Sequence, residues 1–434
     1  LGGQTLEEQH RDLIGQVASL RATLAVMTND VASIMAQARR ALEYLSLDNL
    51  TVRTAANWAL GHAHQLAGDR AEAGRAFAEV LSFGTFGDSI YTLAAAITAG
   101  HLQNSELQPS RAAKTFARAL ELAGDPPQPM AAEAHLGLAR ISYQRNDLEA
   151  AVAHGQRCFE LLRLMEKVPT VASFHMFRAR LALAVDDVPG AFAELEEAAD
   201  YVNQRGFQFQ LPDIAGVQVL TLLRKGDVVA AERLAEAHQL PLGRARVRLA
   251  KGDPAEALAV LEPWRRQVEE RGWADERLKA MVLQSLAFAA NGELGAAADH
   301  LAGALALAEP AGLIRVFVDE GAEMAGLLTG AVQRGTSPRY AGTLLAAFAS
   351  EDHRRAEGEI SERPAADQPL DDPLSNRELE VLRLIASGLS NREISERLFR
   401  ALDTVKGYSR SIYGKLEVNS RTEAVARARE LGLL

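Results

Sequence analysis

The stretch Ser375-Asn376-Arg377-Glu378 opens the last part of the chain, about sixty residues long, and places a serine three residues before a glutamate. The same spacing returns at Ser390/Glu393 and at Ser420/Glu423. In a capping box the serine hydroxyl accepts a hydrogen bond from the backbone N–H three residues on, and the glutamate accepts one from the serine N–H. Three such boxes, each before an apolar run at helical spacing, predict a compact set of short helices.

The third of these helices, expected over about residues 403–416, has two different faces. Its apolar residues, which should point inward, are Val405, Ile412 and Leu416. Its outward stripe is basic around a glycine and consists of Lys406, Gly407, Arg410 and Tyr413. Two helices joined by a tight turn, the second with a basic face, are typical of a helix-turn-helix. A fourth helix should run from Ser420 to the end of the chain.

Two runs in this segment resemble the DNA-binding domain of the LuxR family: Asp403-Thr404-Val405-Lys406 and Lys415-Leu416-Glu417-Val418-Asn419-Ser420-Arg421. The resemblance covers residues 373–434. It implies base-edge contacts from Lys406, Gly407 and Arg410, with Tyr408 in the same DNA-facing set. It implies phosphate contacts from Thr404, Lys415 and Arg421. It also implies that the last helix pairs two such domains, through Ala424, Val425 and Leu431, which nothing later in the chain would cover.

Three positions depart from the family pattern. Ala401 stands where the family usually has a serine as N-cap, and losing such a cap costs about 1 kcal/mol, although Asp403 could cap the helix slightly later. Gly407 and Tyr408 replace a β-branched or polar residue and a histidine. Glycine costs up to ~1 kcal/mol of helix propensity, so we expect the fold to survive with an altered operator preference.

Composition and charge favour helices with one basic end. Apolar residues make up 48% of the 434 residues and aromatic residues only 6%, which favours helices packed through small side chains. The net charge is −10, yet residues 372–434 hold eleven basic and nine acidic residues, or +2, which leaves −12 for the rest. An acidic body should meet DNA only through this basic end.

Cysteine use and hydropathy indicate a cytoplasmic protein, associated with the nucleoid when bound to DNA. Cys158 is the single cysteine, so no intrachain disulfide can form, and its apolar neighbours favour packing over chemistry. No apolar run approaches the ~20 residues that cross a bilayer, so no membrane contact is expected. The first residue is Leu1 rather than methionine, which suggests a fragment or a processed product.

Residues 1–350 repeat a short pattern in which an acidic residue after a small turn residue precedes an alanine by four positions. The pairs are Asp69/Ala73, Asp147/Ala151, Asp187/Ala191, Asp227/Ala231, Asp253/Ala257 and Glu293/Ala297, with a degenerate copy at Gln108/Ala112. The turn residues are Gly68, Asn146, Asp186, Gly226, Gly252 and Gly292. A period near forty, shortened once around Pro241, predicts a helix-pair solenoid in which the acidic residue caps one helix and the alanine allows close packing.

The solenoid resembles a known regulator type. Leu60 to Asp69 resembles a tetratricopeptide unit, and Arg315 to Gly321 after Glu309-Pro310 resembles the end of the solenoid in large MalT-like regulators of the LuxR family. Such regulators carry an ATPase module ahead of the solenoid. This chain has no Gly-x-x-x-x-Gly-Lys-Ser/Thr motif, so we expect that module to lie upstream or to be lacking.

Residues 351–372 break the repeat pattern. They are rich in charge and proline and poor in apolar residues, so they predict a flexible charged linker between the solenoid and the domain at 373–434.

Catalytic and cofactor sites are not expected. His62 and His64 are two apart and should point to different faces, and adjacent glutamates splay around a helix rather than forming an acid/base pair. We therefore expect no enzyme activity, metal or cofactor in this chain. Phe207 and Phe209 alternate with glutamines between Gly206 and Pro212, so at least one ring could face a ligand groove, although most rings should fill the core.

The sequence therefore predicts an all-α protein: a tetratricopeptide-like solenoid, a linker and a four-helix helix-turn-helix domain. Its expected function is transcriptional regulation, with activation as the expected direction, through double-stranded DNA and self-association on it. The solenoid would sense a small-molecule inducer or a protein partner, and RNA polymerase is a further candidate partner. The alternative is an interaction scaffold whose DNA contact is secondary.

Overall fold

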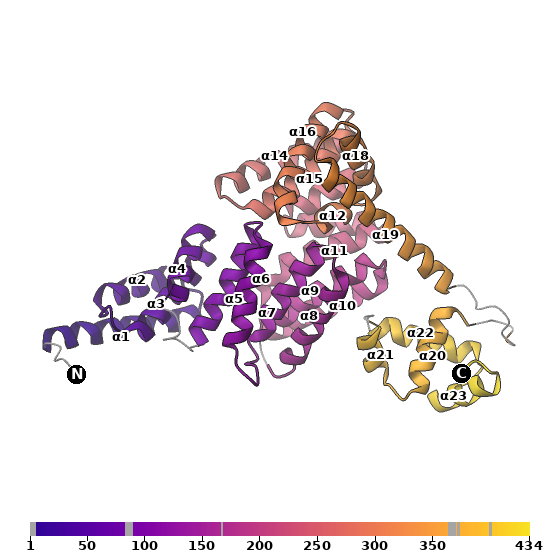
Figure 1. The fold of residues 1–434 in the computed structure, drawn as a ribbon, viewed down its shortest axis with the longest axis horizontal. Helices are drawn as coiled ribbons and strands as arrows, with labels where there is room; N and C mark the ends of the chain where they lie inside the picture. The colour runs from indigo at the N-terminus through magenta and orange to yellow at the C-terminus, as the bar shows by residue number, and fades with distance from the viewer. Residues whose placement is uncertain (1–5, 83–89, 166–167, 363–369, 371–373, 399–401) are drawn as a thin grey trace. The chain divides into compact units, whose positions relative to one another are not determined.

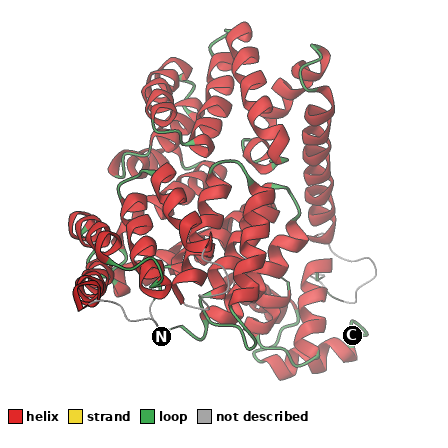
Figure 2. Cartoon of the chain, turned by 60° about the vertical axis from the view of Figure 1, so that its left-hand side comes forward, coloured by secondary structure: helices red, strands yellow, loops and turns green. Residues whose placement is uncertain are grey.

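The computed structural model describes residues 6–82, 90–165, 168–362, 370, 374–398 and 402–434. All regular structure in these residues is helical, and Figure 2 shows red helices joined by green turns with no strand among them. This confirms the predicted all-α fold.

Helices follow one another as pairs joined by short turns (Figure 1). The earlier helices are α1 (Leu6–Val26), α2 (Val31–Tyr44), α3 (Leu50–Leu66), α4 (Arg70–Ser82), α5 (Ile90–Ser105), α6 (Pro109–Leu122), α7 (Ala131–Gln144) and α8 (Leu148–Leu162). The later ones are α9 (Thr170–Ala184), α10 (Val188–Arg205), η2 (Gln208–Gln210), α11 (Leu211–Lys225), α12 (Val228–Ala237), α13 (Pro241–Ala250), α14 (Pro254–Glu270), α15 (Ala274–Ala290) and α16 (Leu294–Ala308). α1 packs against α2, α3 against α4, α5 against α6 and α9 against α10, as in a helical-repeat array.

The turn inside each pair repeats one backbone geometry. Its glycines have φ between 77° and 84°, and Asn146 and Asp186 have φ of 62° and 60°. This left-handed region is open to glycine and is reached by asparagine and aspartate more readily than by other residues. The glycines in question are Gly68, Gly226, Gly252 and Gly292, so all six predicted turn residues adopt it.

The predicted caps and alanines take the expected roles. The carboxylates of Asp69, Asp147, Asp187 and Asp227 each accept a hydrogen bond from the backbone N–H three residues on, at 3.0–3.1 Å. Glu293 and Gln108 make no such cap. The alanines of the repeat are at most 1% exposed, which allows the paired helices to approach closely: Ala73, Ala112, Ala151, Ala191, Ala231, Ala257 and Ala297.

The chain divides into two compact units. One comprises Leu1–Ile141, Arg157–Met165 and Arg265–Arg277, and the other comprises Ser142–Gln156, Glu166–Trp264 and Leu278–Leu434. In the first unit the turn before α15 meets the turn before α4, because the Arg70 guanidinium lies 2.6 Å from Asp275 and the Trp273 ring nitrogen donates to the Gly68 carbonyl at 3.3 Å.

After the last pair, the chain of the second unit continues through η3 (Glu309–Ala311), α17 (Arg315–Val318), α18 (Ala322–Gln333) and α19 (Pro338–Glu362). The Ile314 N–H donates to the Gln144 carbonyl at the end of α7, at 2.7 Å. Arg315, at the start of α17, is 1% exposed. The segment that resembled the end of a regulator solenoid is therefore tied into the repeats.

The predicted linker at 351–372 is wrong in its first half. α19 continues to Glu362, and Glu351 is buried at 6% exposure because it forms an ion pair with Arg315. A charged residue in such a run can be buried when it pairs with a buried residue of opposite charge. Residues 363–369 and 371–372, the rest of that linker apart from Leu370, lie outside the described residues.

Candidate DNA-binding site

The C-terminal bundle consists of α20 (Asn376–Ala386), α21 (Asn391–Arg397), α22 (Leu402–Lys415) and α23 (Arg421–Glu430), drawn in yellow in Figure 1. Its core draws one apolar face from each helix. The buried residues are Leu374, Leu379, Val381, Leu382, Ile385, Ile394, Val405, Ile412, Leu416, Ala424 and Ala428. The expected inward face of α22 is thereby confirmed.

Two of the three predicted capping boxes form completely. The Ser375 hydroxyl accepts from the Glu378 N–H at 3.1 Å, and Glu378 accepts from the Ser375 N–H at 2.7 Å. Ser390 and Glu393 do the same at 3.2 and 2.7 Å. The third prediction is half wrong: Ser420 caps α23, but the Glu423 carboxylate accepts from the Asn419 N–H instead.

Glu378 joins α20 to α22. Its carboxylate accepts from the Ser411 hydroxyl at 2.5 Å and from the Lys415 ammonium at 2.9 Å, in addition to its bond within the capping box. Burial alone would raise the pKa of Glu378, but the hydrogen bonds from Ser411, Ser375 and Lys415 hold it below its ordinary value. The glutamate of the first box thus also anchors α22, a role that its sequence spacing did not reveal.

Lys415 and Arg421, both expected on phosphates, make contacts inside the domain. Lys415 pairs with the buried Glu378. One Arg421 amino group donates to the Ile385 carbonyl at 2.8 Å and to the Leu389 carbonyl, and so satisfies carbonyls at the end of α20. Sequence reasoning missed these roles because both partners lie more than thirty positions away.

Ser409 on α22 contacts the start of α21, because its hydroxyl lies 2.9 Å from the Val405 carbonyl and 3.2 Å from the Asn391 side-chain oxygen. Asn391 begins α21, so this contact holds the two helices of the helix-turn-helix together. No feature of the sequence singled out Ser409.

The outer face of α22 carries the predicted basic stripe. Arg410 and Gly407 are exposed, and Lys406 is half-buried. A Cβ added to Gly407 would meet no atom within 4 Å, so α22 is open to a partner at this point. Tyr408 and Tyr413 pack partly against the core, which corrects the outward placement expected for Tyr413. The side chains of Thr404 and Asp403, and residue Ala401, lie outside the described residues.

The three residues expected at a dimer contact lie against the core of their own domain. Ala424 is fully buried, and Val425 and Leu431 pack on the same core. The expectation that nothing in the chain covers them is therefore wrong. The helical period places Ala424 and Ala428 on the inner face of α23, and Val425 borders that face.

The two rings proposed to face a ligand, Phe207 and Phe209, lie edge to face with their centroids 6.2 Å apart, but their surroundings differ. Phe207 stacks on Tyr201 with centroids 6.1 Å apart and packs against the core of α9 to α11. Phe209 is 67% exposed. Of the remaining candidate groups, Cys158 is buried, and burial raises the pKa of its thiol to about 12, which makes it unreactive.

Among the described residues, no helix is both long enough and apolar enough to cross a membrane. Within the same residues, no three histidine, cysteine, aspartate or glutamate side chains gather into a group that could hold a metal ion.

Comparison with known proteins matches both parts of the chain. Residues 15–334 match the family described as the MalT-like TPR region, and residues 372–428 match the bacterial regulatory proteins of the luxR family. The HTH-type transcriptional regulator MalT of Klebsiella pneumoniae is 30% identical over 202 residues, which cover 44% of this chain and 22% of that protein. MalT of Vibrio cholerae is 28% identical over 199 residues, or 43% and 22%.

The chain thus aligns with about a fifth of the length of these relatives. Among solved structures, a Rap protein complexed with Competence and Sporulation Factor is similar with a TM-score of 0.45 and 12% identity, over 71% of this chain and 98% of that one.

A helical-repeat array that precedes a helix-turn-helix bundle defines a class of DNA-binding regulators. Because the first family match covers more than half of the chain, the chain belongs to the MalT-like family, and its C-terminal domain is of the LuxR type.

Proposed function

We propose that this chain regulates transcription by binding operator DNA through α22. The observation that carries the proposal is the exposed stripe of Arg410 and Gly407, with the half-buried Lys406, on a helix whose other face fills the bundle core. Helices of this kind lie in the major groove, where arginine and lysine read the O6 and N7 atoms of guanine. Tyr408, on the next position of the same helix, would contribute from the edge of that stripe.

The charge distribution supports an approach to DNA by this domain. Residues 372–434 carry about +2 of charge, whereas the remaining chain carries −12. Such asymmetry repels DNA from the repeats and leaves the basic domain as the contact. Thr404, at the start of α22, would contact a phosphate. For Lys415 and Arg421 the internal contacts favour a different role, in which they hold α22 and α23 in position against α20.

Regulation would come from the repeats, which we propose to sense a small-molecule inducer or a protein partner and to activate transcription, with RNA polymerase as a downstream partner. The support is the family to which the repeats belong and the two MalT relatives, which are HTH-type transcriptional regulators. Self-association on DNA is part of the proposal. Since Ala424 is buried, the contact would have to use the exposed side of α23, which includes Ala426 and Arg427.

The proposal is tested by selecting duplexes from a random pool with the full chain, then measuring affinity for the enriched duplex and for a scrambled duplex of the same length. We expect a recurrent sequence and at least a thousandfold preference for it, the lower bound for specific regulators. Enrichment of no common sequence, with equal affinities that both vanish in moderate salt, would instead show the secondary, non-specific DNA contact of a scaffold.

A further inference from the structure

The second unit contains a cavity of about 450 Å³ on the helical repeats, away from the DNA-binding bundle in sequence. Its walls come from the first helix of successive pairs, α7, α9, α11, α13 and α15, and from the segment after α17. Small-molecule sites in proteins have volumes of about 300–1,000 Å³. Six leucines form the apolar part of the lining: Leu183, Leu220, Leu223, Leu249, Leu283 and Leu286.

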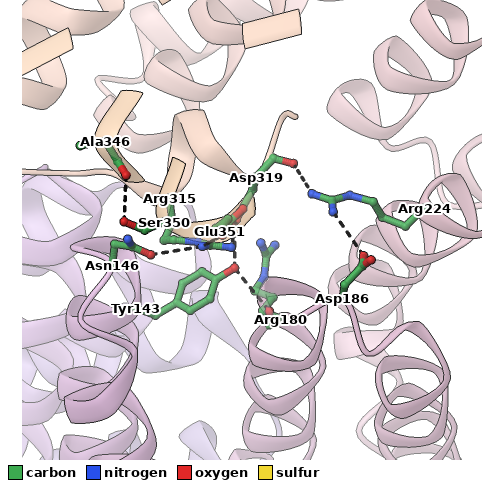
Figure 3. A network of polar contacts seen from close by, with 10 residues as sticks. All are labelled: Tyr143, Asn146, Arg180, Asp186, Arg224, Arg315, Asp319, Ala346, Ser350 and Glu351. Atoms are coloured by element: carbon green, nitrogen blue, oxygen red, sulfur yellow. Dashed lines mark hydrogen bonds and ion pairs between the residues drawn. The ribbon is translucent and has the colours of Figure 1, made fainter. Parts of the chain in front are cut away.

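Asp319, at the polar side of this cavity, is committed to three partners (Figure 3). Its carboxylate accepts from the Tyr143 hydroxyl at 2.9 Å and lies 2.6 Å from the Arg315 guanidinium. Its backbone carbonyl accepts from Arg224 at 3.1 Å. Burial, and then the negative charge of Asp319, raise the pKa of Tyr143, so its hydroxyl stays a neutral donor to this carboxylate. Asp319 therefore has little capacity left for a cation.

A second ion pair neutralises another part of the lining. Arg246 donates to both carboxylate oxygens of Glu320, one of them at 3.0 Å, and their side chains are 18% and 10% exposed. Two parallel N–H···O bonds of this kind are a strong, oriented arrangement. Glu323, the remaining carboxylate of the lining, lies at an exposed position.

Arg180 is different from these charges. Figure 3 shows its side chain rising from α9 between Tyr143 and Asp186, and no ion pair or hydrogen bond joins its guanidinium to any side chain drawn there. Among all the described residues, no carboxylate lies within ion-pair distance of it. A half-buried guanidinium beside leucines and without a counter-ion is a receptor for an anion, because an acidic group would supply charge-assisted hydrogen bonds.

We propose that this cavity binds a small amphiphile with a single carboxylate, whose head group pairs with Arg180 and whose apolar body lies on the leucines. The proposal rests on the sensing role proposed for the repeats and names the ligand class. A neutral sugar fits less well, because Tyr143 is the one aromatic residue among the described lining residues and its hydroxyl is already used. A cation fits less well, because Asp319 and Glu320 are paired.

The test is calorimetric titration of the full chain, without DNA, with octanoate, 1-octanol, octylamine and octyl phosphate. We expect octanoate to bind and to bind most tightly. Arg180→Gln should weaken octanoate binding by about ten- to a hundredfold, the loss expected for one charge-assisted contact. Arg339→Gln, an equal charge change at an exposed position of α19, should leave it unchanged. Circular dichroism confirms that each variant is folded.

Several results would overturn the proposal. If octanol binds as tightly as octanoate, or if Arg180→Gln binds octanoate normally, the ligand carboxylate does not pair with Arg180. Tighter binding of octyl phosphate would assign another acid to the head group, and no binding of any octyl compound would reject the amphiphile. Because no DNA is present, each of these failures is distinct from a failure of operator binding, which is measured separately on the same protein.

Discussion

Arg315 and Glu351 form a buried ion pair that joins α17 to α19, with side chains 2% and 7% exposed. The same guanidinium also contacts Asp319 and, at 3.2 Å, the side-chain oxygen of Asn146 in the α7–α8 turn (Figure 3). It lies 5.1 Å from the centre of the Tyr143 ring. One arginine therefore fastens three segments of the second unit, and α19 leads from this point toward the DNA-binding bundle in sequence.

Removing one member of this pair should strongly destabilise the second unit. In Glu351→Ala the buried Arg315 charge keeps Asp319 as its one carboxylate partner, so the variant should lose about 1.5–3 kcal/mol, the range for a hydrogen bond to a charged group. Chemical denaturation followed by circular dichroism measures the loss. Glu197→Ala, at an exposed position of α10 in the same unit, is the control and should change stability by less than about 0.5 kcal/mol. Equal stability of the two variants would mean that the pair does not anchor α19.

The Glu378 carboxylate predicts a pH dependence of the DNA-binding bundle. Its folded pKa lies below the ordinary value of 4.5, so the folded state binds fewer protons than the unfolded chain. The stabilisation is therefore present above pH 4.5 and is lost as the pH falls through the lower, folded pKa. The protection of α20 and α22 peptides from hydrogen exchange, relative to the intrinsic rate at each pH, should fall over that window.

Glu378→Gln isolates this contribution. At pH 7 the variant should lose about 1.5–3 kcal/mol of local stability, the range for hydrogen bonds to a charged group. It should also lose much of the fall in protection that the wild type shows below pH 4.5. Glu417→Gln, at an exposed position, serves as the control. A wild-type bundle whose exchange protection does not change in acid would contradict the assignment.

Gly407 predicts a stabilising substitution. Since a Cβ at this position meets no atom within 4 Å, Gly407→Ala should add about 0.5–1 kcal/mol through helix propensity alone. Local hydrogen exchange of α22 reports the gain, and Gly388→Ala is the contrast, because Gly388 has φ of 91° and alanine is strained there. If Gly407→Ala does not slow the exchange, or if Gly388→Ala slows it equally, Gly407 does not weaken α22 through helix propensity.

Substitution of Lys415 and Arg421 tests whether these residues hold α22 and α23 in position or contact DNA phosphates. If they position α22 and α23, Lys415→Ala and Arg421→Ala should lower the stability of the bundle by about 1–3 kcal/mol. The slope of log affinity against log salt concentration for DNA should then stay near the wild-type value. A slope smaller by about one in either variant, with normal stability, would instead place that residue on a phosphate.

Much of this fold follows from helix capping and helical periodicity, which depend on residues close together in the sequence. An aspartate after a left-handed residue caps a helix whatever lies beyond it, so Asp147 and Asp227 could be assigned from spacing alone. The inward face of α22 followed from the helical period in the same way. The basic stripe of Lys406, Gly407 and Arg410 could be predicted because it lies on that helix away from the core.

The missed features depend on partners distant in sequence. Nothing near Glu351 in the sequence indicates that it forms a buried ion pair with Arg315, so its charged surroundings predict a linker. The sequence alone indicates that Lys415 is a surface cation, because its partner Glu378 lies on α20, far away in the chain. The cavity at Arg180 is formed by residues from six segments, and no motif marks it. Phe207 and Phe209, in contrast, form a pattern within four consecutive residues, which the sequence alone displays.

The central claim, that α22 reads operator sequence, is tested most directly by one comparison. The affinity of the full chain for its selected duplex, divided by that for a scrambled duplex, is measured for wild type, Lys406→Ala, Arg410→Ala and Arg383→Ala. Arg383 lies exposed on α20 and matches the charge change. We predict that this ratio falls by about five- to 150-fold in the two α22 variants, equivalent to about 1–3 kcal/mol for each base contact, and stays unchanged in Arg383→Ala. An unchanged ratio in both α22 variants would contradict the account.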